Sequence, residues 1–409
     1  MMHILFLNHN IARRGGTFYR AYHAGRYLAR RGHTVTLLTI SAERRQGFDR
    51  EISEGVEIIH TPDLLNGIGR TGWDPWDTLQ RVSYLHGRQW DIIHAWDCRP
   101  AVILPALYAR TQSRQSGGRL VVDWCDWWGR GGTQAERPGK VAKMLYGPLE
   151  TFFEEAFRTQ ADGTTVASAA LRDRALRLGV APEPLMILPG GSDTETIQVL
   201  DKKNPREKLG ISPDTVVIGY MGAITLKETK LLIESIEEAR KHVPNLMLLA
   251  VGTTVAGSAL SFSDVAGSVA RPWLRETGRI PFSEVGYYLA ACDAFVLPLI
   301  RNISNTARWP SKLNDYLAVG RPIVATRVGD IATYFQRYSI GITTDDHALA
   351  LARGMVSLIQ QPALANYLGD RARQLAEEEL NWTTLISQLE AFYKRVRLQP
   401  TPSSERSAL

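Results

Sequence analysis

The sequence contains few cysteines and no long apolar run. Cys98, Cys125 and Cys292 are far apart and odd in number, so neither a disulfide framework nor a metal-binding knuckle is indicated. No apolar stretch approaches the roughly 20 residues that are needed to cross a bilayer. The opening residues, 1–7, are too short for a signal peptide and lack its basic start. We therefore expect a protein of the reducing cytoplasm.

A strong excess of charge is also missing. The formal net charge is +6 over 409 residues, and no stripe of lysine and arginine is interleaved with aromatic residues. Both features argue against a nucleic-acid-binding protein. The composition, with 44% hydrophobic and 22% charged residues, is typical of a globular protein.

Short apolar runs alternate with helical patterns along the chain, which is typical of parallel sheets built from βαβ units. The pattern restarts near residue 216, after a turn-rich segment over 189–213. We predict an α/β protein with two Rossmann-like, doubly wound domains over 1–195 and 196–380, a helix over 381–398 and a disordered tail over 399–409. Strands are predicted over 3–7, 35–40, 56–60, 91–95, 120–124, 164–166 and 185–188, and then over 216–220, 246–251, 294–297 and 322–326.

One helix in the second half has both ends marked by its sequence. Pro310 suits the helix start, and Gly320 suits the position just past its end. Ser311 and Asp315 are four residues apart and share one face, with Lys312 beside them. The helix start can bind phosphate, while a carboxylate one turn on can accept hydrogen bonds from ribose hydroxyls. A capped amphipathic helix with solvated polar residues would have the same pattern.

Two further segments offer phosphate-binding groups. Gly15 and Gly16 follow the first predicted strand and enter a helix, where their backbone N–H groups could approach a phosphate. A G-x-G-x-x-G fingerprint does not follow that strand, which argues against a dinucleotide-dependent dehydrogenase. Gly222 follows the strand over 216–220, and Lys227 comes five residues later. A flexible turn and an ordinary surface lysine are the alternatives.

Polar residues follow other predicted strands, where ligands of such sheets gather. In the first domain they are His94, Trp96, Asp97, Asp123 and Asp126. Paired carboxylates there could orient hydroxyls or transfer protons, beside tryptophans suited to stacking on sugars. A core-edge histidine and buried structural carboxylates remain alternatives. In the second domain, residues 303–308 are predicted to form a polar loop. The side chains of Asn305 and Arg308 in this loop could contact the same diphosphate as Lys227.

Several of these segments occur in an order that resembles the retaining, nucleotide-sugar-dependent glycosyltransferases of family 4, which have the GT-B fold. The segments are Gly222 with Lys227, 189–193, 278–284, and 310–312 with 320–322. The resemblance extends over nearly the whole chain. It implies two domains facing across a cleft, with the acceptor mostly on the first and the sugar nucleotide mostly on the second. It also implies a last helix that crosses back to the first domain.

The resemblance assigns roles to individual residues. Gly15 and Gly16 match the glycine loop near the donor phosphates, and Lys227 matches the residue that contacts the diphosphate. Asp315 matches the second acidic residue of the family's paired-glutamate signature, which holds the ribose. Ser311, Lys312 and Leu313 match the segment that wraps phosphate and ribose.

Three positions depart from the family's pattern. The first glutamate of the pair would fall near Ala307, and the arginine after the second-domain glycine is replaced by Ala223. The histidine that usually ends the strand before the donor site stands as Asp126 or is missing. These departures keep open a non-catalytic partner subunit with the same fold.

The resemblance implies a transferase that moves a sugar from a nucleotide-diphosphate sugar to a hydroxyl of a glycan, a polysaccharide or a lipid-linked acceptor. Lys227 would stabilise the leaving diphosphate, and Asp126 would position sugar or acceptor. Neither a metal ion nor another cofactor is implied. A sugar-nucleotide epimerase with the same fold is a further alternative.

A set of tryptophans and arginines in the first domain is compatible with peripheral membrane contact. These residues are Trp73, Trp76, Trp90 and Trp96 with Arg70, Arg81 and Arg88. Tryptophan and arginine suit a membrane interface and anionic lipid head groups. Scattered tryptophans of a protein core would give the same sequence.

Overall fold

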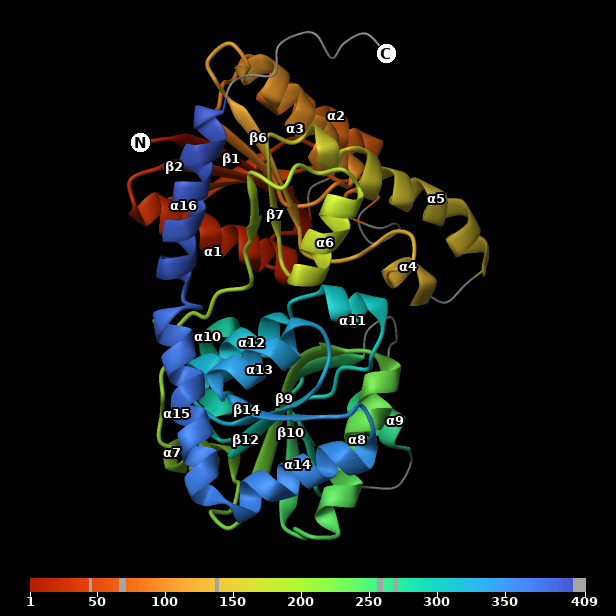
Figure 1. The fold of residues 1–409 in the computed structure, drawn as a ribbon, viewed down its shortest axis with the longest axis vertical. Coiled ribbons are helices and arrows are strands. Elements are labelled where there is room, and N and C mark those ends of the chain that lie inside the picture. Colours follow the sequence, from red (N-terminus) through yellow and green to blue (C-terminus); the bar gives the residue numbers. More distant parts are fainter. Residues whose placement is uncertain (44–45, 66–70, 137–139, 256–259, 268–270, 400–409) are drawn as a thin grey trace. The chain divides into compact units, whose positions relative to one another are not determined.

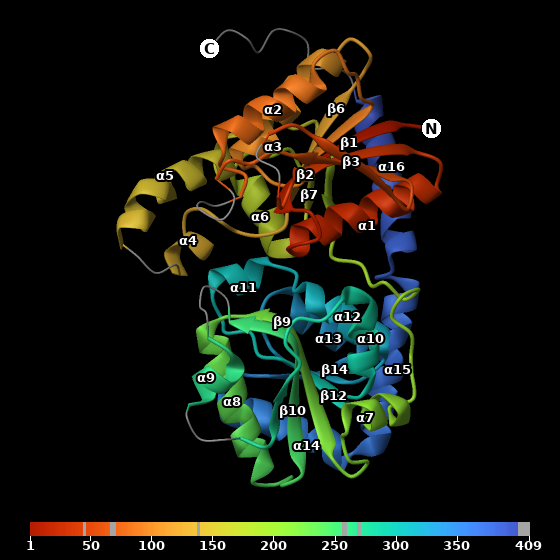
Figure 2. The same ribbon diagram turned by 180° about the vertical axis from the view of Figure 1, so that it is seen from behind.

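The computed structural model describes residues 1–399 except 44–45, 66–70, 137–139, 256–259 and 268–270 (Figure 1). The chain divides into two compact units, which Figure 2 shows from behind. Unit 1 comprises Met1–Pro189, Ala307–Trp309 and the chain from Trp382 onward, and unit 2 comprises Gly190–Thr306 and Pro310–Asn381. The tail predicted over 399–409 lies outside the described residues, apart from Gln399.

Unit 1 contains an eight-stranded sheet in the order β3-β4-β2-β1-β5-β6-β7-β8. Every neighbouring pair is parallel except β3 and β4. The strands are β1 (His3–Ile11), β2 (Thr34–Ile40), β3 (Asp49–Ser53), β4 (Val56–Thr61), β5 (Ile92–Ala95), β6 (Arg119–Trp124), β7 (Gly163–Val166) and β8 (Leu185–Ile187).

Helices cover both faces of this sheet, so β1 is apolar on both sides. Ile4 and Phe6 pack in a core with α1 and α16, whereas Leu5 and Leu7 pack in a core with α3. This alternation follows from the two-residue period of a strand. The helices are α1 (Gly16–Arg30), α2 (Pro75–Leu85), α3 (Pro100–Ser113), α4 (Thr133–Glu136), α5 (Lys140–Ala156), the 3-10 helix η1 (Arg158–Gln160), α6 (Ala169–Arg177) and α16 (Trp382–Leu398).

Unit 2 contains a six-stranded parallel sheet in the order β11-β10-β9-β12-β13-β14. The strands are β9 (Val216–Ile224), β10 (Leu246–Val255), β11 (Leu274–Glu276), β12 (Ala294–Leu297), β13 (Ile323–Thr326) and β14 (Gly341–Thr344). The helices are α7 (Lys203–Leu209), α8 (Leu226–Arg240), α9 (Phe262–Ala266), α10 (Phe282–Ala290), α11 (Ile303–Ala307), α12 (Ser311–Val319), α13 (Asp330–Tyr338), α14 (Ala348–Gln360) and α15 (Pro362–Glu378). Its strand order reverses direction at β9 and β12, and ligands of doubly wound sheets bind at such a switch point.

The structure corrects the predicted elements at several points. The strands β3, β11 and β14 were not predicted, and residues 303–307 form the helix α11 instead of a polar loop. The turn-rich segment 189–213 contains the helix α7. Each missed element has three to seven residues, which is too short to show a clear period in sequence. None of the helices that the structure describes combines the length and the hydropathy of a bilayer-spanning segment.

Candidate active site

In unit 2, Gly222 lies near the carboxyl end of β9, and only Thr225 separates this strand from α8 (Figure 1). Gly222 has a φ of 74°, a conformation that favours glycine. Thr225 caps α8, and Glu228 completes a capping box with it. Lys227, the second residue of the helix, is exposed, and no carboxylate of the described residues pairs with its amine. A free cation and a helix N-terminus therefore lie close together, an arrangement that attracts phosphate.

The start of α12 is docked on the same end of β9. The amine of Lys312 contacts the Tyr220 hydroxyl, donates to the Ala223 carbonyl at 2.7 Å and lies 4.1 Å from the centre of the Tyr220 ring. The Met221 N–H donates to the Tyr316 hydroxyl at 2.8 Å. The structure therefore places the Lys312 amine next to the Gly222 segment. Pro310 occupies the N-cap position, so the helix begins at Ser311, one residue later than predicted.

Asp315 lies one turn into α12, on its half-buried side. Burial and the nearby carboxylate of Asp193 raise the pKa of Asp315 to about 7. Among the described residues, no donor forms a hydrogen bond with this carboxylate. Its oxygens are therefore free to accept hydrogen bonds from a ligand.

The other residues that were predicted to bind the donor sugar nucleotide in unit 2 take part in the packing of the protein. Leu313 is fully buried, so its side chain belongs to the core of unit 2 and only its backbone could contact a ligand. Asn305 is 4% exposed, and its amide donates to Glu228 and to the Ile300 carbonyl, both at 2.7 Å. The side-chain amide of Asn305 thus fixes the first turn of α8 through its hydrogen bond to Glu228. Arg308 is half-buried and lies in the stretch Ala307–Trp309, which groups with unit 1.

In unit 1, the glycine pair lies where β1 leads into α1. Gly15 has a φ of 82°, and a Cβ added there would lie 2.8 Å from the side-chain nitrogen of Asn10. Gly16 begins α1 with open space around it. The backbone N–H groups at this helix start have no side-chain cap. They form a second position suited to an anion.

His94 and Trp96 belong to the core of unit 1, the alternative that the sequence left open for the histidine. Both are fully buried and their rings stack with centres 4.2 Å apart. The ring nitrogens of His94 bond to the hydroxyls of Tyr393 at 2.6 Å and Thr165 at 3.2 Å. Burial lowers the pKa of His94 to about 3, so the ring is neutral and enclosed, and direct contact with an acceptor is not supported.

Asp123 has a structural environment as well. It is fully buried and pairs with the Arg20 guanidinium at 3.2 Å. Its Oδ1 also accepts a hydrogen bond from the Thr165 hydroxyl. This paired, hydrogen-bonded carboxylate fits the structural alternative. A substrate could contact the accessible neighbours of Asp123 instead.

Three of the seven residues predicted for membrane contact lie inside unit 1. Trp90, Trp96 and Arg81 are buried, and Arg81 pairs with Asp77 inside unit 1 at 2.8 Å. Trp73 and Trp76 are half-buried, and Arg70 lies outside the described residues. The prediction is wrong for the three buried side chains because they fill the core.

Asp126 lies in the loop after β6 and is half-buried. Burial raises the pKa of its carboxyl group, and the Cys125 thiol donates to it at 3.6 Å. The same thiol contacts the hydroxyl of Thr17, in the first turn of α1, at 3.6 Å. The structure therefore brings the Asp126 loop to the glycine pair.

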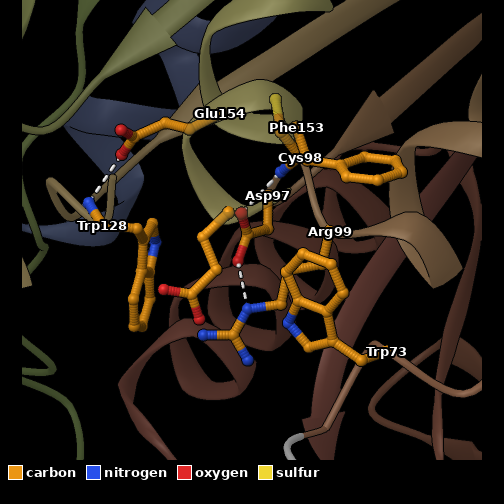
Figure 3. Close-up of a pocket in the computed structure, with 8 residues that line it drawn as sticks. Trp73, Asp97, Cys98, Arg99, Trp128, Phe153 and Glu154 are labelled. Carbon is orange, nitrogen blue, oxygen red and sulfur yellow. Dashed lines mark hydrogen bonds and ion pairs between the residues drawn. The ribbon is translucent and has the colours of Figure 1, made fainter. Parts of the chain in front are cut away.

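Asp97 lines a pocket of unit 1 that Figure 3 shows in close-up. Its carboxylate pairs with His9 at 3.1 Å and with Arg99 Nε at 3.2 Å. The Arg99 guanidinium lies 4.3 Å from the centre of the Trp128 ring. The lining residues are Trp73, Asp97, Cys98, Arg99, Trp128, Glu150, Phe153 and Glu154. The free volume of this pocket, about 10 Å³, is that of a single water molecule, so the pocket does not admit a sugar ring.

Sequence reasoning missed His9, Arg99 and Phe153. His9 follows the predicted first strand by two residues and Arg99 follows Asp97 by two residues, so proximity to strand ends was an available signal. Phe153 lies on α5 and reaches Trp73, with ring centres 5.5 Å apart. No local pattern could have indicated that contact between residues 80 positions apart.

Comparisons with known proteins agree along the whole chain. The profile of Glycosyltransferase Family 4 matches residues 14–196, and the profile of Glycosyl transferases group 1 matches 214–361. TuaH of Bacillus subtilis (strain 168), a glycosyltransferase assigned to teichuronic acid biosynthesis, is 22% identical over 395 residues, which are 91% of this chain and 92% of TuaH.

Solved structures show the same architecture. Sucrose-phosphate synthase from Thermosynechococcus elongatus matches with a TM-score of 0.70 at 18% identity, over 97% of this chain and 99% of that chain. Anabaena HepE matches with a TM-score of 0.69 at 15% identity, over 96% of this chain and 100% of its own.

The two doubly wound parallel-sheet units and these likenesses define a GT-B glycosyltransferase. The chain belongs to glycosyltransferase family 4, within the group 1 glycosyltransferases. The family and fold expected from the sequence are thus confirmed.

Proposed function

We propose that this glycosyltransferase moves a sugar from a nucleoside-diphosphate sugar to an acceptor hydroxyl, with retention at the anomeric carbon. The observation that carries the proposal is the unpaired, half-buried carboxylate of Asp315. It lies about one helical turn, or roughly 5.4 Å, beyond the start of α12. That spacing suits a ribose at Asp315 and a diphosphate at the helix start. HepE, which shares the fold, was crystallised with UDP-glucose.

The diphosphate would be held by the exposed Lys227 at the start of α8, by the turn at Gly222 and by Ser311. Lys312, anchored on Tyr220, adds positive charge beside the turn. As the bond from the anomeric carbon to the diphosphate breaks and the bond to the acceptor oxygen forms, negative charge grows on the diphosphate. Cations fixed at that point stabilise the transition state. The departing diphosphate takes the acceptor's proton, and neither a metal ion nor another cofactor enters this scheme.

The acceptor would bind on unit 1. Trp128 and Trp73 are half-buried there and offer apolar faces to it. Asp126, beside the glycine pair, would position the reacting sugar or hydroxyl. The acceptor would be a glycan, a polysaccharide or a lipid-linked molecule in the cytoplasm. The assignment of TuaH to teichuronic acid biosynthesis supports the polysaccharide among these.

Thermal unfolding with UDP, GDP, ADP and CMP, each at millimolar concentration, tests the donor site. A ligand that binds only the folded protein raises the unfolding midpoint. We expect a rise with one nucleoside diphosphate and its loss in Asp315→Ala. Equal midpoints with all four nucleotides would contradict the assignment.

One observation favours a second candidate, a non-catalytic partner subunit. Ala307 occupies the position where the family has the first glutamate of its pair, so no carboxylate is available there to hold the donor sugar. This candidate predicts nucleotide binding without turnover. Incubation with UDP-, GDP- and ADP-sugars and detection of released nucleotide and glycosylated product by mass spectrometry would separate the two.

A further inference from the structure

The loop between β6 and α4, residues 125–132, carries two consecutive tryptophans, Trp127 and Trp128. We call it the tryptophan loop, and both of its tryptophans are half-buried. The Arg174 guanidinium lies 3.9 Å from the centre of the Trp127 ring. The Arg99 guanidinium lies 4.3 Å from the centre of the Trp128 ring. Each ring therefore lies against its own arginine and keeps part of its surface accessible.

A single carboxylate on α5, that of Glu154, holds the backbone of this loop (Figure 3). Glu154 is 3% exposed. One of its oxygens accepts hydrogen bonds from the Trp128 N–H at 2.6 Å and from the Trp124 indole at 3.2 Å. The other oxygen accepts from the Gly129 N–H at 2.8 Å and from the Arg174 guanidinium at 3.4 Å. Both oxygens are therefore acceptors, a pattern that a glutamine amide cannot reproduce.

The two backbone hydrogen bonds fix the direction of the Trp128 side chain. The N–H groups of Trp128 and Gly129 belong to the two peptide units that flank the Trp128 Cα. Because peptide units are planar, the two bonds together restrict both backbone dihedrals of Trp128. The indole is attached through the same Cα, so Glu154 determines the direction in which the ring leaves the backbone.

Gly129 lets the tryptophan loop approach α5 closely enough for these bonds. A Cβ added at this glycine would lie 2.7 Å from Oε2 of Glu154 and 2.9 Å from the Cα of Thr151. Carbon atoms in favourable contact are about 3.5–4.0 Å apart. The Thr151 Cα is part of the helix backbone, which cannot turn aside as a side chain can. The glycine of the loop and the carboxylate of the helix therefore form one contact.

We propose that Glu154 is a positioning residue for acceptor binding: it fixes the tryptophan loop, and through the loop it places the Trp128 ring where an acceptor sugar can lie against it. The inference rests on the proposed function, in which Trp128 offers an apolar face to the acceptor. All residues of the contact between the loop and α5 belong to unit 1. Nucleotide binding to unit 2 therefore tests the proposed function separately from this role of Glu154.

Fluorine NMR of the full chain labelled with fluorotryptophan tests this role. The variants Trp127→Phe and Trp128→Phe assign the two loop resonances, and glucose, N-acetylglucosamine and glucuronic acid serve as probes of the acceptor position. In the parent protein we expect at least one of these sugars to shift the Trp128 resonance. Glu154→Gln should move both loop resonances in the free protein. It should also weaken the apparent sugar affinity by about tenfold, because a hydrogen bond from the loop to a charged group is lost.

A second variant breaks the same contact from the side of the loop. Gly129→Ala leaves Glu154 intact but displaces the loop from α5, so it should weaken the sugar affinity by a similar factor. The double variant Glu154→Gln/Gly129→Ala should bind no more weakly than the weaker single variant, because both substitutions remove one contact. Glu155→Gln is the matched control. Glu155 is the next residue of α5 and pairs with Arg174 at 2.7 Å, and its replacement should leave the Trp128 resonance and the sugar affinity unchanged.

The possible outcomes separate this role from a purely structural one. If Glu154 only stabilises the fold, Glu154→Gln lowers the unfolding midpoint but leaves the sugar affinity of the folded protein unchanged, and the proposal is overturned. Additive effects of Glu154→Gln and Gly129→Ala would overturn it as well. A parent Trp128 resonance that responds to none of the three sugars would remove Trp128 from the acceptor site, and this role of Glu154 with it. The unfolding midpoint in the presence of UDP, GDP and ADP decides independently whether the chain binds a donor.

Discussion

The side-chain amide of Asn305 donates a 2.7 Å hydrogen bond to Glu228, which closes the capping box of α8. Both residues are almost fully buried. The bond links the segment before α12 to the helix that carries Lys227, so it fixes the two helix starts that are proposed to bind phosphate. Asn305 is thus a positioning residue of the proposed donor site.

Substitution of Asn305 should weaken the connection between the segment before α12 and the start of α8. Asn305→Ala removes a hydrogen bond to the buried carboxylate of Glu228, which costs about 1–3 kcal/mol of stability. We expect a lower unfolding midpoint and weaker binding of nucleoside diphosphate. Asn305→Asp, which keeps the shape but opposes two carboxylates, should be at least as destabilised. Unchanged unfolding midpoints in both variants would show that the hydrogen bond from Asn305 to Glu228 does not contribute to stability.

Lys227 should be needed for turnover but not for folding. Its side chain is exposed and pairs with no described carboxylate, so Lys227→Ala should keep the parent unfolding midpoint. The loss of a cation at the leaving group should lower kcat/KM by about 100-fold or more. Lys230→Ala, one turn along the same exposed helix, is the matched control and should retain activity. An active Lys227→Ala enzyme would remove this residue from the mechanism.

Asp315 should make nucleotide binding and stability respond to pH in opposite ways. Its pKa of about 7 lies above the usual value, so the folded state binds a proton more tightly than the unfolded chain does. This contribution to stability is present at low pH and is lost as the pH rises toward 8. Nucleotide affinity should rise over the same interval, because the ionised carboxylate is the better acceptor for ribose hydroxyls.

Asp315→Asn separates these two effects. The variant no longer ionises, so at pH 8 its free energy of unfolding should exceed that of the parent by about 1–2 kcal/mol. Its nucleotide affinity should be lower and no longer vary with pH near 7. Denaturant unfolding and calorimetric titration at pH 6, 7 and 8 measure both quantities. A parent protein whose affinity is flat over this range would contradict the pKa assignment.

Trp128, which is half-buried on unit 1, should contribute to acceptor binding without affecting binding of the donor. Trp128→Ala removes the ring that lies against the Arg99 guanidinium, and we expect the acceptor KM to rise by about tenfold or more, as for the loss of a stacking contact. Nucleoside diphosphate affinity should stay at the parent value. Trp127→Phe alters the same loop outside the pocket lining and serves as the control. A shift in nucleotide affinity alone would place Trp128 at the donor.

The sequence predicted the long elements well because their periods are clear. The two sheets, the helix from residue 311 and its glycine stop were all visible in local patterns, and Leu313, Tyr316 and Leu317 are buried as expected. The burial of His94 and Trp96 could not be predicted in the same way. It depends on Tyr393, which lies 299 residues further along the chain.

Membrane contact was misjudged for a related reason. Sequence reasoning assigned it to arginines and to four tryptophans, and two of these tryptophans, Trp90 and Trp96, are buried in the core of unit 1.

The packing of α16 has a consequence for the biogenesis of the protein. Residues of α16, among them Trp382, Leu385, Phe392 and Tyr393, complete a hydrophobic core whose remaining members lie between residues 2 and 188. Domains usually fold in order as they leave the ribosome, but this one cannot close until the final helix has been translated. The apolar face of unit 1 that α16 covers therefore stays exposed while unit 2 is synthesised. A nascent chain that stops short of residue 382 should be a substrate for chaperones and proteases.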